Sequence, residues 1–314
     1  MQRIQYHRYG GPDVMRLETY DLSAPGKGEV LVRVKAASIN PLDWKLRQGF
    51  MKLVMGRRFP RAMGIDFSGV IEAVGPGVTD VSAGDAVLGW TPMMAPGAFA
   101  ETVVTTSNLV IKKPPNLSFP EAAALPSVGV TAWRALIDVG GLKAGQSVFI
   151  NGAAGGVGQA AIAIARAFGA AITARVGPSA VAELSSSGLT RVLDYNQPLP
   201  VDLAQSFDVV FDCHGSLTAE EEEMLIKPSG VAIDIDPTLG NLFRSLTSSK
   251  HRMVRGLPSQ EILGKVLGLA VDGFFPIAIS RTAPLSEAIA LITDLEAGRR
   301  AGGKAVILME QAFA

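Results

Sequence analysis

The chain is poor in the residue types that build metal sites and covalent cross-links. Its 314 residues include one cysteine and three histidines. The single cysteine, Cys213, excludes an intrachain disulfide framework and a four-cysteine zinc lobe. The histidines, at positions 7, 214 and 251, do not have the spacing of metal ligands. We therefore expect no metal site.

Excess charge and long apolar runs are also absent. The 29 basic and 29 acidic residues cancel, which argues against nucleic acid as a partner. The sequence lacks both an apolar run of about 18 residues and the apolar core of a signal peptide, so we expect no membrane partner. Hydrophobic residues make up 48% of the chain, enough for a sizeable core. A soluble cytoplasmic enzyme of two domains is the expected class.

Short β-like runs separated by Gly and Pro turns occupy residues 1 to about 120. Examples are EVLVRVKAASI (29–39) and GAFAETVVTT (97–106). Many short strands with regular turns predict an antiparallel barrel or sandwich. The stretch KKPPNLS (112–118) then marks a break, because two prolines continue neither a ladder nor a helix.

Strands alternate with helices in the second region, which predicts a parallel, doubly wound α/β sheet. Helical runs over 119–140 are interrupted near Pro126, and a helix over 158–168 is stopped by Gly169. A helix over 221–230 is expected to precede a strand at 231–236. The chain ends in a further helix, a glycine-rich turn and a terminal strand.

The stretch NGAAGGVG (151–158) lies between a buried strand and an alanine-rich helix. Its spacing Ala153-x-Gly155-x-x-Gly158 is a variant of the dinucleotide-binding fingerprint. Gly155 would let the main chain approach a pyrophosphate, and Gly158 would let the helix pack closely on the strand. Amides at the helix start then meet the phosphates. The sequence therefore predicts dinucleotide binding.

The second strand of this unit carries no acid at its end. NAD sites usually place Asp or Glu there to hold the ribose 2′-hydroxyl, whereas this chain has Arg175. A guanidinium suits a 2′-phosphate better than a neutral diol. The cofactor is therefore predicted to be NADPH.

Several motifs in order along nearly the whole chain resemble the medium-chain dehydrogenase/reductase superfamily, in its zinc-free quinone oxidoreductase (zeta-crystallin-like) branch. The resemblance implies a GroES-like β-barrel catalytic domain, 1–121 completed by 256–314, and a Rossmann NADP-binding domain with a doubly wound parallel sheet, 122–255. The motifs are INPLDWKLRQG (39–49), GIDFSGVIEAVG (64–75), GDAVLG (84–89), GAFAE (97–101), AAALPSVGVTAW (122–133), NGAAGGVG (151–158), LDY (193–195), FDVVFDCHG (207–215) and the final GGKAVIL.

The resemblance also implies site residues. Asn40 and Asp43 lie where the family meets nicotinamide and substrate. Thr131 matches a contact to the nicotinamide end, and Tyr195 matches a tyrosine against the adenosine 2′-phosphate. The expected cofactor-binding residues are Thr131, Ala154, Gly155, Gly156, Val157, Arg175, Tyr195 and Cys213. We expect Cys213 to be a packed residue rather than a nucleophile.

Zinc-dependent relatives place ligands where this chain has Asn40 and Gly64-Ile65-Asp66. One acid does not make the three protein ligands of a catalytic zinc, so we expect no metal in the site. Hydride transfer from NADPH to a quinone or an α,β-unsaturated carbonyl asks for no metal, since the conjugated carbonyl accepts the charge. Lys45 or water is the predicted proton source; Asp43 either acts directly or caps its turn.

Alternative functions remain open. One is an enoyl-thioester reductase of a biosynthetic pathway, for which GRRFPR (56–61) would be a basic patch. Another is a non-catalytic NADPH-binding protein. The stretch 89–99, GWTPMMAPGAF, predicts an apolar lip for a bulky carbonyl compound, with Trp44, Phe50 and Phe274 as further candidates. A homodimer is possible from the resemblance.

Overall fold

The computed structural model describes residues 1–236, 238–275, 278–299 and 302–309. They divide into two compact units. The first unit holds residues 1–126 and 258–264 with the described residues from 278 onward. The second holds the described residues of 127–257 and 265–275. Among the described residues, no helix has the length and apolar character needed to cross a membrane.

The first unit is built on two sheets, mostly antiparallel. The smaller sheet has the order β2-β1-β4, and the larger has the order β15-β16-β3-β5-β6-β8 with β7 also paired to β3. Their bounds are β1 (Gln2–Tyr6), β2 (Met15–Thr19), β3 (Glu29–Ser38), β4 (Arg61–Ala62), β5 (Asp66–Val74), β6 (Ala86–Trp90), β7 (Thr102–Thr106), β8 (Val110–Lys112), β15 (Ile279–Pro284) and β16 (Lys304–Leu308). The strand predicted over 29–39 is confirmed as β3, whereas of the run predicted over 97–106 only Thr102–Thr106 forms a strand, β7.

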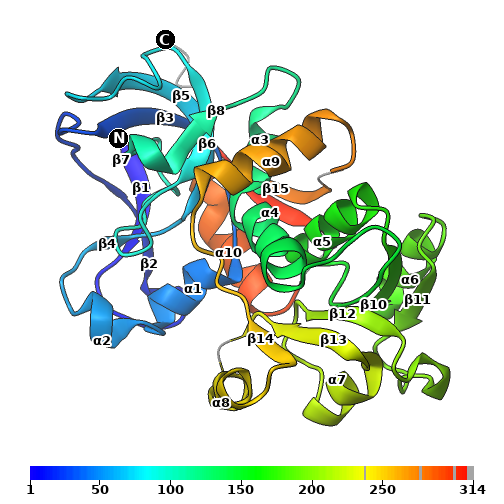
Figure 1. Cartoon of the computed structure of the whole chain (residues 1–314). Helices are drawn as coiled ribbons and strands as arrows, with labels where there is room; N and C mark the ends of the chain where they lie inside the picture. Colours follow the sequence, from blue (N-terminus) through cyan, green and yellow to red (C-terminus); the bar gives the residue numbers. More distant parts are fainter. Residues whose placement is uncertain (237, 276–277, 300–301, 310–314) are drawn as a thin grey trace. The chain divides into compact units, whose positions relative to one another are not determined.

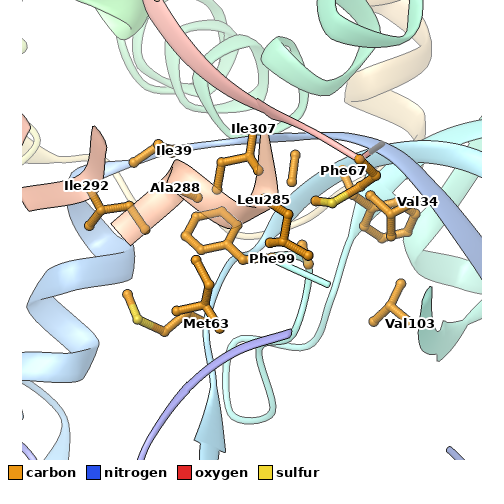
Figure 2. Packing of buried hydrophobic residues seen from close by; sticks show 14 of the residues in the cluster. Val34, Ile39, Met63, Phe67, Phe99, Val103, Leu285, Ala288, Ile292 and Ile307 are labelled. Atoms are coloured by element: carbon orange, nitrogen blue, oxygen red, sulfur yellow. The ribbon is translucent and has the colours of Figure 1, made fainter. Parts of the chain in front are cut away.

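Alternation along β3 explains how the larger sheet covers its core. Val30, Val32 and Val34 are buried, while the residues between them are partly or fully exposed. This period of two places the valines on one face of the sheet. The buried face rests on the rings of Phe67 and Phe99, both fully buried (Figure 2).

The end of the chain completes this core. Leu285, Ala288 and Ile292 pack with Ile307 against Phe99 and its neighbours (Figure 2). Ala288 and Ile292 lie on α10 (Ala288–Glu296), and Ile307 lies on β16, which pairs with β3. Ile4 also belongs to this cluster, which therefore joins the beginning of the chain to Ile307 near its end.

Short helices connect the strands of the first unit. They are α1 (Pro41–Gln48), α2 (Lys52–Met55) and α3 (Phe119–Ala124); α9 (Gln260–Val271) divides between the units. Pro41 is at the first position of α1, where its missing N–H costs nothing. Gly49, with φ of 96°, ends α1 in the left-handed conformation.

The second unit contains the predicted parallel sheet. Its order is β11-β10-β9-β12-β13-β14, and every pairing is parallel. The strands are β9 (Ser147–Asn151), β10 (Ala171–Val176), β11 (Arg191–Asp194), β12 (Phe207–Asp212), β13 (Ile226–Asp234) and β14 (His251–Met253). The helices are α4 (Pro126–Trp133), α5 (Gly156–Ala167), α6 (Pro178–Ser185), α7 (Ala219–Leu225) and α8 (Leu239–Thr247), with a π-helix at Arg134–Val139.

One boundary in this unit differs from the prediction. The helix expected over 221–230 ends at Leu225, and β13 already begins at Ile226. Pro228 cannot continue a helix, because it lacks the N–H and its ring meets the preceding turn. Pro228 lies in β13 at the point where the β12–β13 register is irregular.

Candidate functional site

A buried polar cluster surrounds the start of α1 in the first unit. The Asn40 side-chain amide donates to Asp66 Oδ2 at 3.0 Å, and its Oδ1 accepts from Lys304 Nζ at 2.7 Å. Lys304 Nζ also donates to the carbonyl of Ile39 at 3.1 Å. The Asp43 carboxylate accepts the main-chain N–H of Asn40 at 2.7 Å. The structure thus brings Asn40 and Asp43 together and adds Asp66 and Lys304.

Burial governs the charges in this cluster. Desolvation, followed by the nearby Asp66 carboxylate, raises the pKa of Asp43 to about 8 against the opposing effects of the Asn40 amide and Lys304. Burial also lowers the pKa of Lys304, while Asp66 and Asp43 oppose that shift. Burial therefore favours the neutral form of both the Asp43 carboxyl group and the Lys304 amine.

The hydrogen bonds of Asn40 and Asp43 define what each can offer. One amide hydrogen of Asn40 goes to Asp66, and its nitrogen also lies 3.4 Å from the Ser38 carbonyl. The other oxygen of Asp43, Oδ1, is buried without a hydrogen-bond partner. Lys45 lies on α1, two residues after Asp43, and is partly buried. Their catalytic roles stay predictions.

The positions that carry zinc ligands in the zinc-dependent relatives hold a different arrangement here. Asn40 and Asp66 are hydrogen-bonded to each other, and the Lys304 ammonium contacts Asn40. The Asn40 oxygen already accepts a hydrogen bond from Lys304 Nζ, and a lysine amine is not among the usual zinc ligands. The residues present at this place do not fit a catalytic zinc.

A separate carboxylate cluster lies in the second unit. Among the described residues, Asp212, Glu222 and Asp234 are the group whose ligand atoms are close enough together to hold a metal ion. Arg244 donates to Glu222 at 2.7 Å and lies 3.7 Å from Asp234. Asp212 already accepts four hydrogen bonds, including one from the side chain of Asn151. A guanidinium and local donors therefore fill the places a metal would take.

The glycine-rich turn between β9 and α5 has the geometry expected of a phosphate-binding loop. Gly152 has φ of 77°, a conformation that favours glycine. A Cβ on Gly158 would lie 2.4 Å from the Gly152 carbonyl oxygen, so α5 packs on the turn only because that side chain is absent. Gly155 precedes α5 with no side chain capping its first turn. The amides at the start of α5 are thus open to an anion.

Arg175, Tyr195 and Gly177 gather at the ends of β10 and β11. The Arg175 guanidinium donates to the Tyr195 carbonyl at 3.2 Å and lies 3.5 Å from Glu221 Oε1. Its Nε is buried without a partner. A Cβ on Gly177 would lie 3.1 Å from the Tyr195 ring. The predicted 2′-phosphate residues therefore lie in one place, beside the uncapped start of α6.

The remaining predicted cofactor residues lie at other strand and helix ends of this unit. Cys213 follows β12, and its main-chain N–H donates to the Asn151 carbonyl at 3.0 Å. Burial raises the pKa of the Cys213 thiol well above its usual value, which fits a packed residue rather than a nucleophile. Thr131 is buried on α4. Gly256 packs closely against it, since a Cβ added to Gly256 would lie 2.3 Å from the Thr131 hydroxyl oxygen.

Asp212 is a residue of this unit that sequence reasoning missed. Its carboxylate accepts the main-chain N–H groups of His214, Gly215 and Leu217 at 2.8–2.9 Å. These bonds fix the loop that carries Cys213. An acid at a strand end directly before a Cys-His-Gly turn was the available signal, since aspartate commonly caps such turns.

The apolar residues considered for the substrate lip divide between core and surface. Trp44 and Trp90 are buried, whereas Phe50, Met94 and Phe274 are exposed. The two tryptophans therefore contribute to the core, whereas the other three side chains lie on the surface of their units.

Comparison with known proteins identifies relatives of this chain. Residues 26–115 match the alcohol dehydrogenase GroES-like domain. A chloroplast envelope quinone oxidoreductase homolog of Arabidopsis thaliana is 31% identical over 304 residues, covering 92% of each chain. A 2-methylene-furan-3-one reductase of Solanum lycopersicum is 33% identical over 318 residues, covering 98% of this chain and 79% of that one.

Solved structures show the same fold over the full length. The quinone oxidoreductase from Coxiella burnetii has a TM-score of 0.89 and 29% identity, and the match covers 99% of both chains. The predicted α/β class, a GroES-like domain with a Rossmann parallel-sheet domain, is confirmed. The chain belongs to the zinc-free quinone oxidoreductase family of the medium-chain dehydrogenase/reductases and is an oxidoreductase of that family.

Proposed function

We propose that this chain is an NADPH-dependent reductase that delivers hydride to a quinone or an α,β-unsaturated carbonyl without a metal. The observation that carries the proposal is the turn of Gly152 to Gly158, where absent side chains leave main-chain amides open to a diphosphate. The names of the two relatives, a quinone oxidoreductase homolog and a reductase of a conjugated ketone, support the same reaction class.

The residues of the second unit fit NADPH. Main-chain amides of Gly156 and Val157 would hold the pyrophosphate at the start of α5. Arg175, whose Nε has no partner, and the Tyr195 ring would hold the 2′-phosphate. Glu221 lies 3.5 Å from Arg175 and keeps the guanidinium in place. Thr131 is proposed to contact the nicotinamide end, and Cys213 is proposed as a further cofactor-binding residue.

Bound NADPH would supply the hydride, and the protein would supply orientation and a place for the new charge. A conjugated carbonyl accepts hydride at its far carbon and places negative charge on oxygen, so a metal is not required. We propose that Lys45 or solvent delivers the proton. Asp43, kept neutral by burial, can hold a proton at neutral pH, and its hydrogen bond to Asn40 fixes the start of α1.

Metal independence is proposed from the cluster around Asn40. Lys304 Nζ, which is buried, donates to Asn40 Oδ1 at 2.7 Å. A zinc ion would have to displace that hydrogen bond and find ligands other than an amide and one carboxylate. The amide of Asn40 is also bonded to Asp66, so both polar groups of the Asn40 side chain already have partners.

A screen of acceptors with NADPH and NADH tests the proposal. We expect oxidation of NADPH with a quinone or an enone, and slower oxidation of NADH. Turnover only with an enoyl thioester would assign the chain to biosynthetic reduction instead. Tight NADPH binding with no turnover on any acceptor would indicate a non-catalytic protein.

A further inference from the structure

Three exposed apolar side chains of the first unit, Phe50, Leu53 and Val54, form what we call the apolar tip. Leu53 and Val54 lie on α2, and Phe50 lies two residues before it. These side chains are 57%, 93% and 70% exposed. Leu53 is the most exposed large apolar side chain among the residues that the structure describes. Figure 1 shows α2 next to α1, within the segment that joins α1 to β4. Exposed apolar groups gathered in this way commonly mark an interaction site.

The folded structure holds the tip in this position. Met55 is buried, and Arg61 donates to its carbonyl. Tyr9 Oη donates to the Gly56 carbonyl at 2.6 Å, and the Tyr9 ring meets Phe59 edge-on with 5.2 Å between ring centroids. The backbone after the tip is thus anchored on an aromatic base. Exposure of Leu53 and Val54 is therefore a property of the fold.

Positive charge surrounds the tip. Residues 44–65 contain six basic residues and no acidic one, although the whole chain carries no net charge. Arg47 is buried and paired with Glu296, but Lys52, Arg57 and Arg58 are exposed. The tip therefore combines free apolar side chains with a local excess of cations.

We propose that this tip docks on the surface of an anionic phospholipid bilayer. Apolar side chains with adjacent cations suit the interface, where the former enter the acyl boundary and the latter meet acidic headgroups. An acidic carrier protein would match Arg57 and Arg58 but would leave Leu53 without a role. The sequence-based expectation of no membrane partner came from the lack of a spanning segment, which a docking tip does not need.

Vesicle co-sedimentation, with neither cofactor nor acceptor present, tests this independently of the proposed reaction. We expect the native chain to bind vesicles of phosphatidylcholine and phosphatidylglycerol, less so at high salt, and not vesicles of phosphatidylcholine alone. The double variants Leu53→Gln/Val54→Gln and Arg57→Gln/Arg58→Gln should each lose about tenfold or more in affinity. Matched controls are Val201→Gln, at an apolar position 89% exposed, and Lys27→Gln/Lys143→Gln, at exposed lysines; both should bind as the native chain.

A fluorescence measurement gives a second readout. In the Leu53→Trp variant, the fluorescence emission of the introduced tryptophan should shift to shorter wavelength when anionic vesicles are added and should not shift with neutral vesicles. The proposal is overturned if the native chain binds neither vesicle, or if the tip variants bind as well as the native chain. Binding to an acidic acyl carrier protein without binding to vesicles would also overturn it and would assign the tip to a protein partner.

Discussion

At the residue scale, the cluster around Asn40 shows how burial sets protonation. Asp43 is buried next to the Asp66 carboxylate. Lys304 donates to the side chain of Asn40 in the same cluster. A carboxyl group in such a place is more stable protonated. The folded state therefore binds a proton that the unfolded chain releases at a much lower pH.

This proton makes stability depend on pH. The pKa of Asp43 rises from 3.8 to about 8 on folding, so between these values the folded state binds more protons, and stability falls as pH rises. We predict that the native chain loses roughly 1 kcal/mol of unfolding free energy per pH unit relative to Asp43→Asn between pH 5 and 7. Urea unfolding of both proteins at each pH measures the difference. Parallel pH profiles would contradict the assignment.

Arg175 is the residue that should choose between the two nicotinamide nucleotides. Charge-assisted bonds to a phosphate are among the strongest a side chain makes. We predict that Arg175→Met raises KM for NADPH by roughly tenfold to a hundredfold and leaves KM for NADH almost unchanged. Arg252→Gln, at an exposed site, is the control. Equal losses with both nucleotides would mean that Arg175 acts through the fold.

At the scale of elements, the turn from β9 into α5 depends on close packing. A Cβ at position 158 would lie 2.4 Å from the Gly152 oxygen and 2.5 Å from Ala153 Cα, both main-chain atoms. We predict that Gly158→Ala destabilises the protein by about 1–3 kcal/mol and weakens NADPH binding. By contrast, Gly268→Ala on α9 meets nothing within 4 Å and should stabilise by up to about 1 kcal/mol. Thermal denaturation measures the stability of both variants, and cofactor titration measures NADPH binding by Gly158→Ala. A Gly158→Ala protein with the stability of the native chain would refute the packing argument.

These elements also show what the sequence could reveal. The turn, Gly158 and the alternation of strands and helices were predictable because their signals are local: spacing, period and glycine. Lys304 was not recognised as part of the site, because its contact with Asn40 spans 264 residues. Only folding brings it to α1. The exposure of Leu53 was equally hidden, since an apolar residue in a helical run is normally expected in a core.

At the scale of the whole molecule, each of the two units holds one of the candidate sites. The first holds the buried polar cluster around Asn40 and takes its core from both ends of the chain. The second holds the open turn and the group of Arg175, Gly177 and Tyr195. The family and the two domain types were predictable from motifs in order along the chain. The acceptor was not, because the side chains that recognise an acceptor follow no fixed spacing in the sequence.

Hydride transfer without a metal is the central claim, and isotope transfer tests it most directly. The chain would be dialysed against a chelator until metal analysis shows none, then mixed with NADPH carrying deuterium at C4 and with an enone. The account predicts unchanged turnover and deuterium on the former alkene carbon farther from the carbonyl. Loss of turnover on chelation with recovery on added zinc, or product without deuterium, would contradict it.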